Sequence, residues 1–315
     1  MKNKKSTLIY LLIIIIITIF VNIRLPYFIS APGGVININE RIESKNNNGS
    51  LNMLYVKEYE GTPATLLMSL FHKNYDVYKI DKIKISNETN KELKERNKLM
   101  LNNSINNAIY VAYKEIGEKL KIKDIQNIVI ATSKDNGLSV GDIILKCDGK
   151  DVQNINDLKE IIENKTPHEF VNLLVKREDI TMDLNVEVNE EHLIGVAIIT
   201  NYEFDDEIDI KFKNSEGGAS GGLMLSLAIY QEISGKDLMK GRKIAGTGTI
   251  DINGNVGPID GIKYKIMGAN KNKIDIIFVP EENYQEASKI IENNNYQMKL
   301  YKVKTLEDAI NYLIN

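Results

Sequence analysis

The pattern of apolar and polar positions opens with one long apolar run at the N-terminus. Lys2, Lys4 and Lys5 precede the run, and no charged residue then occurs from Ser6 to Ile23. A run of about 18 residues is at the short end of what an α-helix needs to cross the hydrocarbon core of a bilayer. The pattern therefore predicts a membrane-spanning helix. A cleaved secretory signal peptide is the alternative, because it also joins a charged start to an apolar segment.

An uncleaved anchor fits the surrounding residues better. The nearby small residue that could precede a cleavage point is Ala31, and Pro32 would follow the cut. The apolar run is also longer than the core of a typical signal peptide. Three lysines before the span, against Arg24 after it, predict a cytoplasmic N-terminus at the cell membrane. The chain from about Leu25 onward would then be extracytoplasmic.

Beyond the span, apolar periodicity divides the chain further. We expect four parts, at residues 1–28 (N-terminus and anchor), 29–118 (a membrane-proximal α/β region), 119–190 (a β-rich module) and 191–315. The second part should hold a turn over 30–35, an alternating strand over 50–61, and a helix over 90–120 whose apolar residues recur every three or four positions.

The last two parts differ in how strands and helices follow one another. In the β-rich module we expect a strand at 127–132, a turn–strand–turn at 136–152, a helix at 155–164, and a hairpin at 170–188 that turns at Arg177–Asp179. From residue 191 the two kinds of element alternate, which is typical of an α/β layer domain. Strands are expected at 193–200, 207–212 and 274–280, helices at 220–234, 260–272 and 282–293, a hairpin at 241–257 turning at Asn253–Gly254, and a last strand and helix over 298–313.

Charge and cysteine content exclude several classes of function. The net charge of the 315 residues is -3 with both signs mixed throughout, so no basic surface for nucleic acid is indicated. Cys147 is the single cysteine, which excludes an intramolecular disulfide and a cysteine-rich metal site. We expect no metal and no other cofactor.

A glycine-rich segment carries the clearest candidate chemistry. Four glycines between Gly217 and Gly222 surround one hydroxyl, Ser220, directly before an apolar helical pattern. A phosphate-binding P-loop would need a lysine in this segment, and none is present, so nucleotide binding is not indicated. A serine at a helix N-terminus can instead act as a nucleophile, and the free N–H groups of Gly218, Ala219 and Gly221 could stabilise an oxyanion.

The base for such a serine has to be sought among few residues. His72, His168 and His192 each lie in a different segment and are better explained as ordinary surface or core histidines. A lysine can replace histidine as the base when burial lowers its pKa. Lys263 and Lys265 both lie on the flanks of the apolar face of the helix expected at 260–272, so periodicity favours Lys265 only weakly.

The β-rich module resembles a PDZ domain of the kind found in bacterial proteases. The residues that carry the resemblance are Leu138, Gly141, Asp142, Ile143, Asp148, Gly149 and Val152. The resemblance implies that an extended peptide adds a strand to a sheet edge, with a helix as the other wall. We place that groove at Ile128, Val129 and Ile130 and at the helix Asn156–Asn164. The alternative is that the module is only a spacer or a regulatory lid. No glycine-rich loop before residue 127 indicates recognition of a peptide C-terminus.

The last part is similar to the proteolytic domain of Lon-type serine–lysine proteases. Three segments carry the likeness: EGGASGGLMLSLAIYQ at 216–231, AGTGTIDINGNVGPIDGIKYK at 245–265 and IIFVPEEN at 276–283. In that family a G-P-S-A-G element holds the nucleophile and P-I-G-G-[LI]-x-x-K ends in the catalytic lysine. The resemblance implies that Ser220 is the nucleophile, that Lys265 rather than Lys263 is the base, and that the Thr247 hydroxyl orients the lysine.

This sequence departs from the family pattern at three positions. Ala219 stands where proline is usual, a second glycine follows at Gly222, and Asp260 replaces a glycine. A carboxylate beside Lys265 would raise the pKa of its amine and weaken the base, unless Asp260 faces solvent.

An anchor, a PDZ domain and a Lon-type domain without an ATPase form the layout of the membrane-anchored, PDZ-containing Lon-like proteases of Gram-positive bacteria. The resemblance implies an ATP-independent endopeptidase that acts on extracytoplasmic peptides or proteins. Lon-type domains often form hexameric rings, so the resemblance also implies a homo-oligomer. An inactive scaffold that binds peptides through its PDZ domain is the alternative function.

Overall fold

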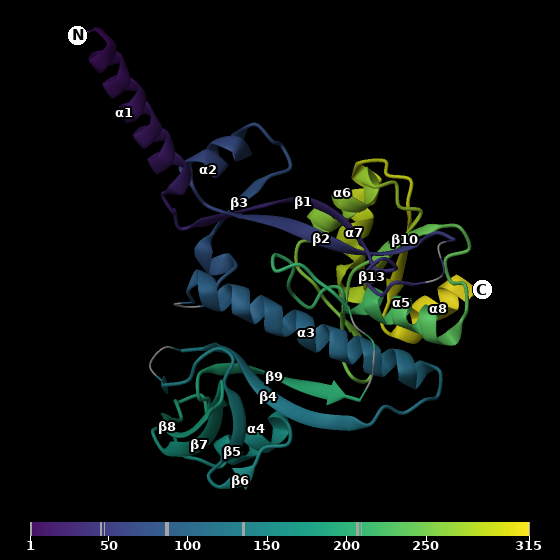
Figure 1. The fold of residues 1–315 in the computed structure, drawn as a ribbon. Coiled ribbons are helices and arrows are strands. Elements are labelled where there is room, and N and C mark those ends of the chain that lie inside the picture. The colour runs from purple at the N-terminus through teal and green to yellow at the C-terminus, as the bar shows by residue number, and fades with distance from the viewer. Residues whose placement is uncertain are drawn as a thin grey trace.

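The computed structural model describes residues 2–44, 46, 48–85, 88–133, 136–205, 208 and 210–314. Helix α1 (Lys2–Asn22) projects away from the folded remainder of the chain (Figure 1). Its segment Lys4–Asn22 is long and apolar enough to cross a membrane and is not covered by other parts of the protein. A signal sequence near an N-terminus has the same properties, so the helix is confirmed while its place in a membrane stays a prediction.

The first of two large sheets joins the two ends of the chain. Its strand order is β14–β13–β10–β2–β1–β3. The strands are β1 (Tyr27–Asn37), β2 (Ser50–Glu60), β3 (Asp76–Lys79), β10 (Lys243–Gly246), β13 (Ile276–Pro280) and β14 (Lys299–Val303). β1 pairs antiparallel with β2 and β3, whereas β2, β10, β13 and β14 run parallel. Residues from the membrane-proximal region and from the C-terminal region therefore share one sheet.

Helices cover both faces of this first sheet (Figure 1). The core on one face includes residues of α3 (Asn90–Glu115), α5 (Gly222–Ser234) and α8 (Leu306–Ile314), and the core on the other includes residues of α6 (Ile262–Lys271) and α7 (Glu281–Asn293). Along β13, Ile276 and Phe278 belong to the first core and Ile277 and Val279 to the second. A strand buried on both faces explains the continuous apolar run in its sequence.

The second sheet forms the β-rich module. Its strand order is β8–β7–β5–β4–β9, and β6 pairs with β5. The strands are β4 (Ile122–Thr132), β5 (Ile143–Cys147), β6 (Lys150–Asp151), β7 (Phe170–Arg177), β8 (Ile180–Glu187) and β9 (Val196–Phe204). Helix α4 (Ile155–Glu163) begins at a capping box formed by Asn154 and Asp157 and packs on the core that contains Cys147. The expected strands, helix and hairpin of this module are confirmed.

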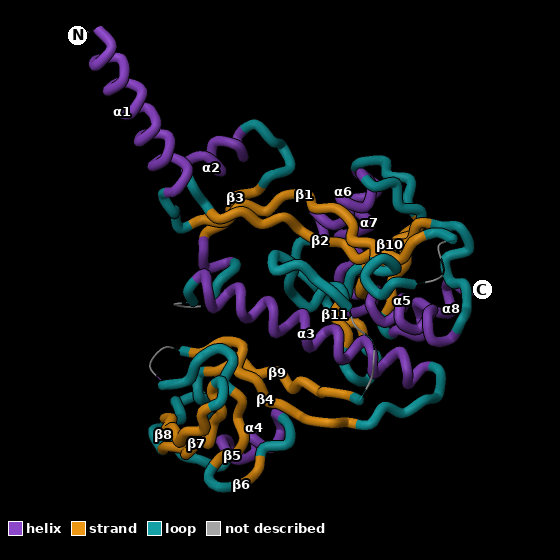
Figure 2. Tube along the Cα trace, viewed as in Figure 1, coloured by secondary structure: helices purple, strands orange, loops and turns teal. Residues whose placement is uncertain are grey.

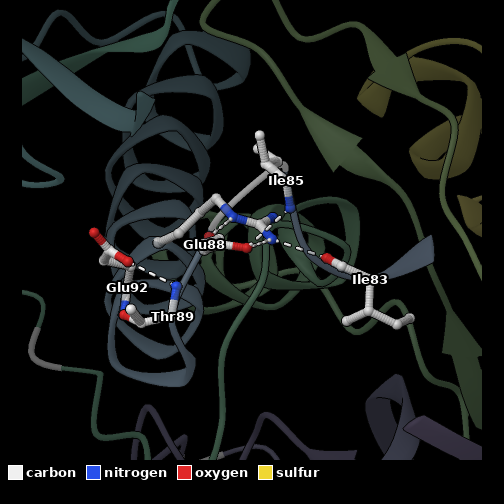
Figure 3. Close-up of polar contacts among 6 residues, drawn as sticks. Ile83, Ile85, Glu88, Thr89 and Glu92 are labelled. Atoms are coloured by element: carbon white, nitrogen blue, oxygen red, sulfur yellow. Dashed lines mark hydrogen bonds and ion pairs between the residues drawn. The ribbon is translucent and has the colours of Figure 1, made fainter. Parts of the chain in front are cut away.

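Helix α3 lies between the two sheets and contacts both α5 and β9 (Figure 2). Hydrogen bonds hold the N-terminal end of α3 in place. Thr89 and Glu92 form a capping box, and Glu88 accepts two hydrogen bonds from the guanidinium of Arg96 at 2.7 and 2.9 Å. The same guanidinium donates to the carbonyl of Ile83 at 3.0 Å (Figure 3). The helix is therefore fixed at its N-terminal end by the segment that leads into it.

The remaining elements are short. They are α2 (Pro63–Leu70), the 3₁₀ turn Ile80–Lys82, and the two-stranded hairpin of β11 (Thr249–Ile250) and β12 (Val256–Gly257). The expected hairpin over 241–257 is thus smaller than predicted, because β10 leaves it to pair with β2 and β13 in the first sheet.

Two further expectations are corrected. Residues 30–35 do not turn but lie in β1, with a bulge between Pro32 and Gly34. A side chain on Gly33 would collide with the main chain of Tyr55, and helix α6 approaches this strand closely at Gly268, so the glycines serve close packing. In the strand expected at 207–212, Glu207 and Asp209 lie outside the described residues and the remaining four are not in a strand.

Candidate active site

Ser220 lies in the turn directly before α5, whose N-cap is Gly221. The glycines around it are required by space and by backbone conformation. Gly218 has a φ of +90°, which disfavours any residue with a side chain, and a Cβ at Gly222 would lie 2.7 Å from a methyl group of Ile250. The glycine-rich segment therefore lets the serine turn pack against its neighbours at main-chain distance.

A hydrogen-bonded chain connects the two residues that resemblance assigned to catalysis. The Nζ of Lys265 donates to the Oγ1 of Thr247 at 3.0 Å, and that hydroxyl donates to the main-chain carbonyl of Ser220 at 3.0 Å. The N–H of Gly248 donates to the same carbonyl at 2.9 Å. The fold thus brings Ser220, Thr247 and Lys265 together from three separate elements, with Thr247 directly after the carboxyl end of β10.

Lys265 is almost completely buried. It is 3% exposed, and Thr247 is 0% exposed. Burial disfavours the charged ammonium and lowers the pKa of Lys265 to about 8, although the negative charges of Asp260 and Glu58 oppose this shift. A substantial fraction of the amine is therefore neutral near physiological pH, which is the form that can accept a proton.

Asp260 and Glu58 place negative charge near the lysine and act on its amine through electrostatic attraction. Asp260 is exposed, and its charge is still the stronger of the two that raise the pKa of Lys265. Glu58 retains more than a third of its accessible surface, yet the surrounding protein desolvates its carboxyl and raises its pKa. The two carboxylates therefore keep the pKa of Lys265 above the value that burial alone would produce.

Lys263 points to a different part of the molecule. It forms an ion pair with Asp76, and the hydroxyl of Tyr264 donates to the same carboxylate at 2.7 Å. Although burial opposes it, these hydrogen bonds lower the pKa of Asp76. Lys263 is thus engaged at β3, while Lys265 faces Thr247. These contacts distinguish Lys263 from Lys265, which helical periodicity did not.

Helix α3 contributes contacts to the serine turn that the sequence analysis did not identify. The buried hydroxyl of Ser104 donates to the carbonyl of Ala219 at 3.1 Å, and the carbonyl of Asn97 accepts from the N–H of Gly218 at 2.7 Å. In a trans peptide the carbonyl and the next N–H point in opposite directions. With the Ala219 carbonyl turned toward α3, the N–H of Ser220 points away from that helix.

A signal for these contacts was present in the sequence. Ser104 and Asn107 are polar, yet both occupy positions in phase with the buried apolar residues of α3. Asn107 donates to the carbonyl of Ile250 at 3.1 Å, beside the β11–β12 hairpin. Polar residues in the apolar stripe of a helix indicate specific hydrogen-bond partners, because burying them unpaired is costly.

The peptide groove expected at Ile128, Val129 and Ile130 does not have the required free edge. β4 pairs with β9 on one side, and on the other side Asn127–Val129 are bonded to the segment 141–144. No peptide strand can add where both edges are already paired. The prediction of a peptide groove on β4 is therefore wrong, because both edges of that strand are paired within the protein.

The strand at the end of this sheet is β9, and it has contacts with α4. The loop from Asn189 leads into it and contains His192 and Gly195 in the left-handed conformation. The outer edge of β9 is covered further along, where the side chain of Asn103 in α3 donates to the carbonyl of Thr200 at 2.9 Å. The stretch before Thr200 is thus the available edge.

A cavity of 490 Å³ lies at the opposite end of the first sheet, lined by residues that include Arg242, Asp275 and Met298. These residues lie near the amino ends of β10, β13 and β14, whereas Thr247 follows the carboxyl end of β10. The cavity is therefore remote from the lysine, and we do not assign the chemistry to it. Among the described residues, no group of three or more His, Cys, Asp or Glu side chains is placed to hold a metal ion.

Comparison with known proteins identifies both folded modules. Residues 201–315 match the family model of the Lon protease (S16) C-terminal proteolytic domain, and residues 124–188 match that of the PDZ domain. Similar curated proteins include the Lon protease of Haemophilus influenzae, 26% identical over 145 residues, and that of Escherichia coli K12, 27% identical over 141 residues. These alignments cover 44% and 43% of this chain and 17% of each relative. Lon protease 1 of Sorangium cellulosum is 32% identical over 93 residues, 30% of this chain and 11% of that protein.

This chain thus spans less than a fifth of the length of these relatives. Among solved structures, the PDZ domain of an SdrC-like protein from Listeria monocytogenes is 19% identical and covers 25% of this chain and 93% of its own, with a TM-score of 0.23.

Proposed function

We propose that this chain, which carries a Lon-type proteolytic domain behind a PDZ domain, is a serine endopeptidase in which Ser220 is the nucleophile and Lys265 the base. One observation carries the proposal: a nearly fully buried lysine with a lowered pKa is hydrogen-bonded to a threonine that also holds the main chain of the glycine-flanked serine. Activated serines of this kind need a nearby base that is neutral at working pH.

The proposed reaction proceeds in two steps. The neutral amine of Lys265 accepts the proton of the Ser220 hydroxyl as the serine oxygen attacks the scissile carbonyl. N–H groups of Ala219–Gly221 stabilise the oxyanion, whereas the N–H expected at Gly218 is not free for this role because it is bonded to the carbonyl of Asn97. The lysine ammonium returns the proton to the leaving amine. Water then attacks the acyl-enzyme while Lys265 accepts its proton, and the lysine returns that proton to the Ser220 oxygen as the acyl–oxygen bond breaks. Thr247 keeps the amine in place and does not itself contact the substrate.

We further propose that hydrolysis needs no nucleotide and that residues 1–28 tether the enzyme to the cell membrane with its catalytic domain outside. The 315 residues contain no G-x-x-x-x-G-K-[ST] motif, and the apolar helix with its preceding lysines supports a single-pass anchor. Substrates would then be extracytoplasmic peptides or proteins.

The PDZ domain is proposed to select those substrates. An extended peptide would add to β9 before Thr200, with α4 as the second wall and the loop Asn189–Gly195 at one end. The Asn103 bond to the Thr200 carbonyl limits the docked segment to a few residues.

The test is hydrolysis of an unfolded protein by the full chain in detergent or liposomes without ATP. Ser220→Ala and Lys265→Ala should each abolish turnover, and the double variant should be no slower than either. Lys263→Ala is the matched control on the same helix and should retain activity, because its side chain pairs with Asp76. Inactive wild type that also fails to react with a fluorophosphonate would contradict the proposal and support the scaffold alternative.

A further inference from the structure

Helix α2 presents an unusual surface. The exposed fractions of Leu67, Leu70 and Phe71 are 47%, 80% and 79%, while the buried residue of the helix is the polar Ser69. A soluble amphipathic helix shows the reverse arrangement, with apolar residues inward. The outward face of α2 therefore lacks the partner that its composition requires.

The polar side chains of α2 do not compensate for this surface, because they bond to the main chain next to them. The hydroxyl of Thr65 donates to the carbonyl of Glu60 at 3.0 Å, and the hydroxyl of Ser69 donates to the carbonyl of Leu66 at 2.7 Å. Thr62 and Thr65 also form a capping box with Pro63 at the first helical position. The helix can therefore enter an apolar medium with its polar side chains satisfied.

In space, the start of α2 lies beside the end of the apolar helix α1. The N–H of Leu25 donates to the carbonyl of Gly61 at 2.8 Å, and the N–H of Gly61 donates to the carbonyl of Tyr27 at 2.7 Å. The side chains of Arg24 and Glu60 form an ion pair at 2.7 Å. The two helices are in contact, and α2 lies beside the base of α1 in Figure 1. The exposed apolar face is thus held next to the point where the chain would leave a bilayer.

We propose that α2 lies in the boundary between the headgroups and acyl chains of the membrane and is a second attachment point beside α1. This rests on the proposal that α1 is a membrane anchor. Leu67, Leu70 and Phe71 supply the apolar contact, and the exposed Lys73 that follows them suits anionic headgroups. Two attachment points fix the tilt of the ectodomain, which a single helix followed by a free linker would not do.

The experiment measures the depth of single spin labels in the full chain, reconstituted in vesicles of phosphatidylethanolamine and phosphatidylglycerol. Cys147→Ala removes the buried native thiol. Leu70→Cys and Phe71→Cys test α2, and Ile14→Cys tests α1. Ile180→Cys is the matched control, because Ile180 is 65% exposed at the hairpin of the PDZ domain. The readout is accessibility to oxygen, which concentrates in lipid, against a water-soluble nickel chelate.

We expect labels at positions 70 and 71 to favour oxygen over the nickel chelate, as the label at position 14 does, and the label at position 180 to show the opposite preference. Labels at 70 and 71 that match position 180 would overturn the inference while leaving the anchor intact. Labels at 70 and 71 inaccessible to both reagents would indicate contact with protein, such as a second copy, and would also overturn it. A water-accessible label at position 14 would refute the anchor, and the inference with it.

Discussion

The pKa of Lys265 makes the pH dependence of acylation the most demanding test of the site. A pKa of about 8 leaves about 10% of the amine neutral at pH 7, against about 0.03% for an unperturbed lysine at 10.5, a gain of about 300-fold. The rate of acyl-enzyme formation should therefore rise with pH and level off above about 8. A burst or single-turnover assay with a fluorogenic peptide measures this rate without interference from product release.

Removing the surrounding carboxylates should move this profile in a known direction. Asp260 and Glu58 both raise the pKa of Lys265, with Asp260 the stronger, so Asp260→Asn should shift the rise to lower pH and Glu58→Gln should shift it less. At pH 7 the gain in rate has a ceiling of about tenfold, because about 10% of the amine is already neutral. The gain should stay below that ceiling, since a base weakens as its pKa falls.

Glu163→Gln is the control, because it removes one charge from the exposed surface of α4, which packs on the second sheet. It should leave the profile unchanged. A wild-type rate that is flat from pH 6 to 10, or a profile that moves to higher pH in Asp260→Asn, would refute the assignment of Lys265 as the base.

Three further outcomes are expected. The folded pKa of Lys265 lies below the unfolded value of 10.5, so its burial costs stability fully below pH 8 and the cost is relieved as pH rises toward 10.5. Lys265→Met should consequently stabilise the fold by up to about 3 kcal/mol at pH 7, with the gain over wild type shrinking between pH 8 and 10.5 in urea titrations; a gain that grows with pH would contradict this. Thr247→Val removes both hydrogen bonds of the hydroxyl and should lower kcat by up to about 100-fold in steady-state assays, while Thr247→Ser should restore most of it. Ser104→Ala removes the shorter of two hydrogen bonds to the Ala219 carbonyl and leaves the one from the N–H of Gly222 at 3.2 Å. It should weaken binding of a peptide boronate together with kcat, by about tenfold, without shifting the pH profile, and Ser104→Thr should recover both; equal loss of substrate and boronate affinity would indicate a merely structural effect.

Local patterns in the sequence were sufficient for most individual elements. Helical spacing predicted α3 and α6, and alternation predicted β2, because the spacing of apolar side chains along one element is local information. The choice between Lys263 and Lys265 was beyond periodicity, since both lie on flanks of the same helix. The contact that distinguishes Lys263 from Lys265 involves Asp76, which belongs to a strand nearly 190 residues earlier in the chain.

Long-range pairing explains what the sequence analysis missed. Gly33 and Gly34 suggested a turn, because glycine serves both turns and close packing. Only the positions of Tyr55 in β2 and of helix α6 distinguish the two. In the same way, the strand expected at 127–132 was present, but whether its edge is free depends on β9, which lies about 70 residues further along. Nothing local to either segment carries that information.

The parallel pairing of β2 with β10 has a consequence for when the candidate active site can form. Asn52 donates a hydrogen bond to the carbonyl of Ile244 across 192 residues, so the sheet beneath the lysine helix cannot close until that distant strand has been made. At about 5–20 residues per second, synthesis of the intervening chain takes about 10–40 s. During this interval the β1–β2 hairpin exists without its central neighbour, and neither Thr247 nor Lys265 has been translated. Assembly of the candidate site is thus delayed by the order of synthesis itself, and α1 is complete long before Ser220, Thr247 and Lys265 can meet.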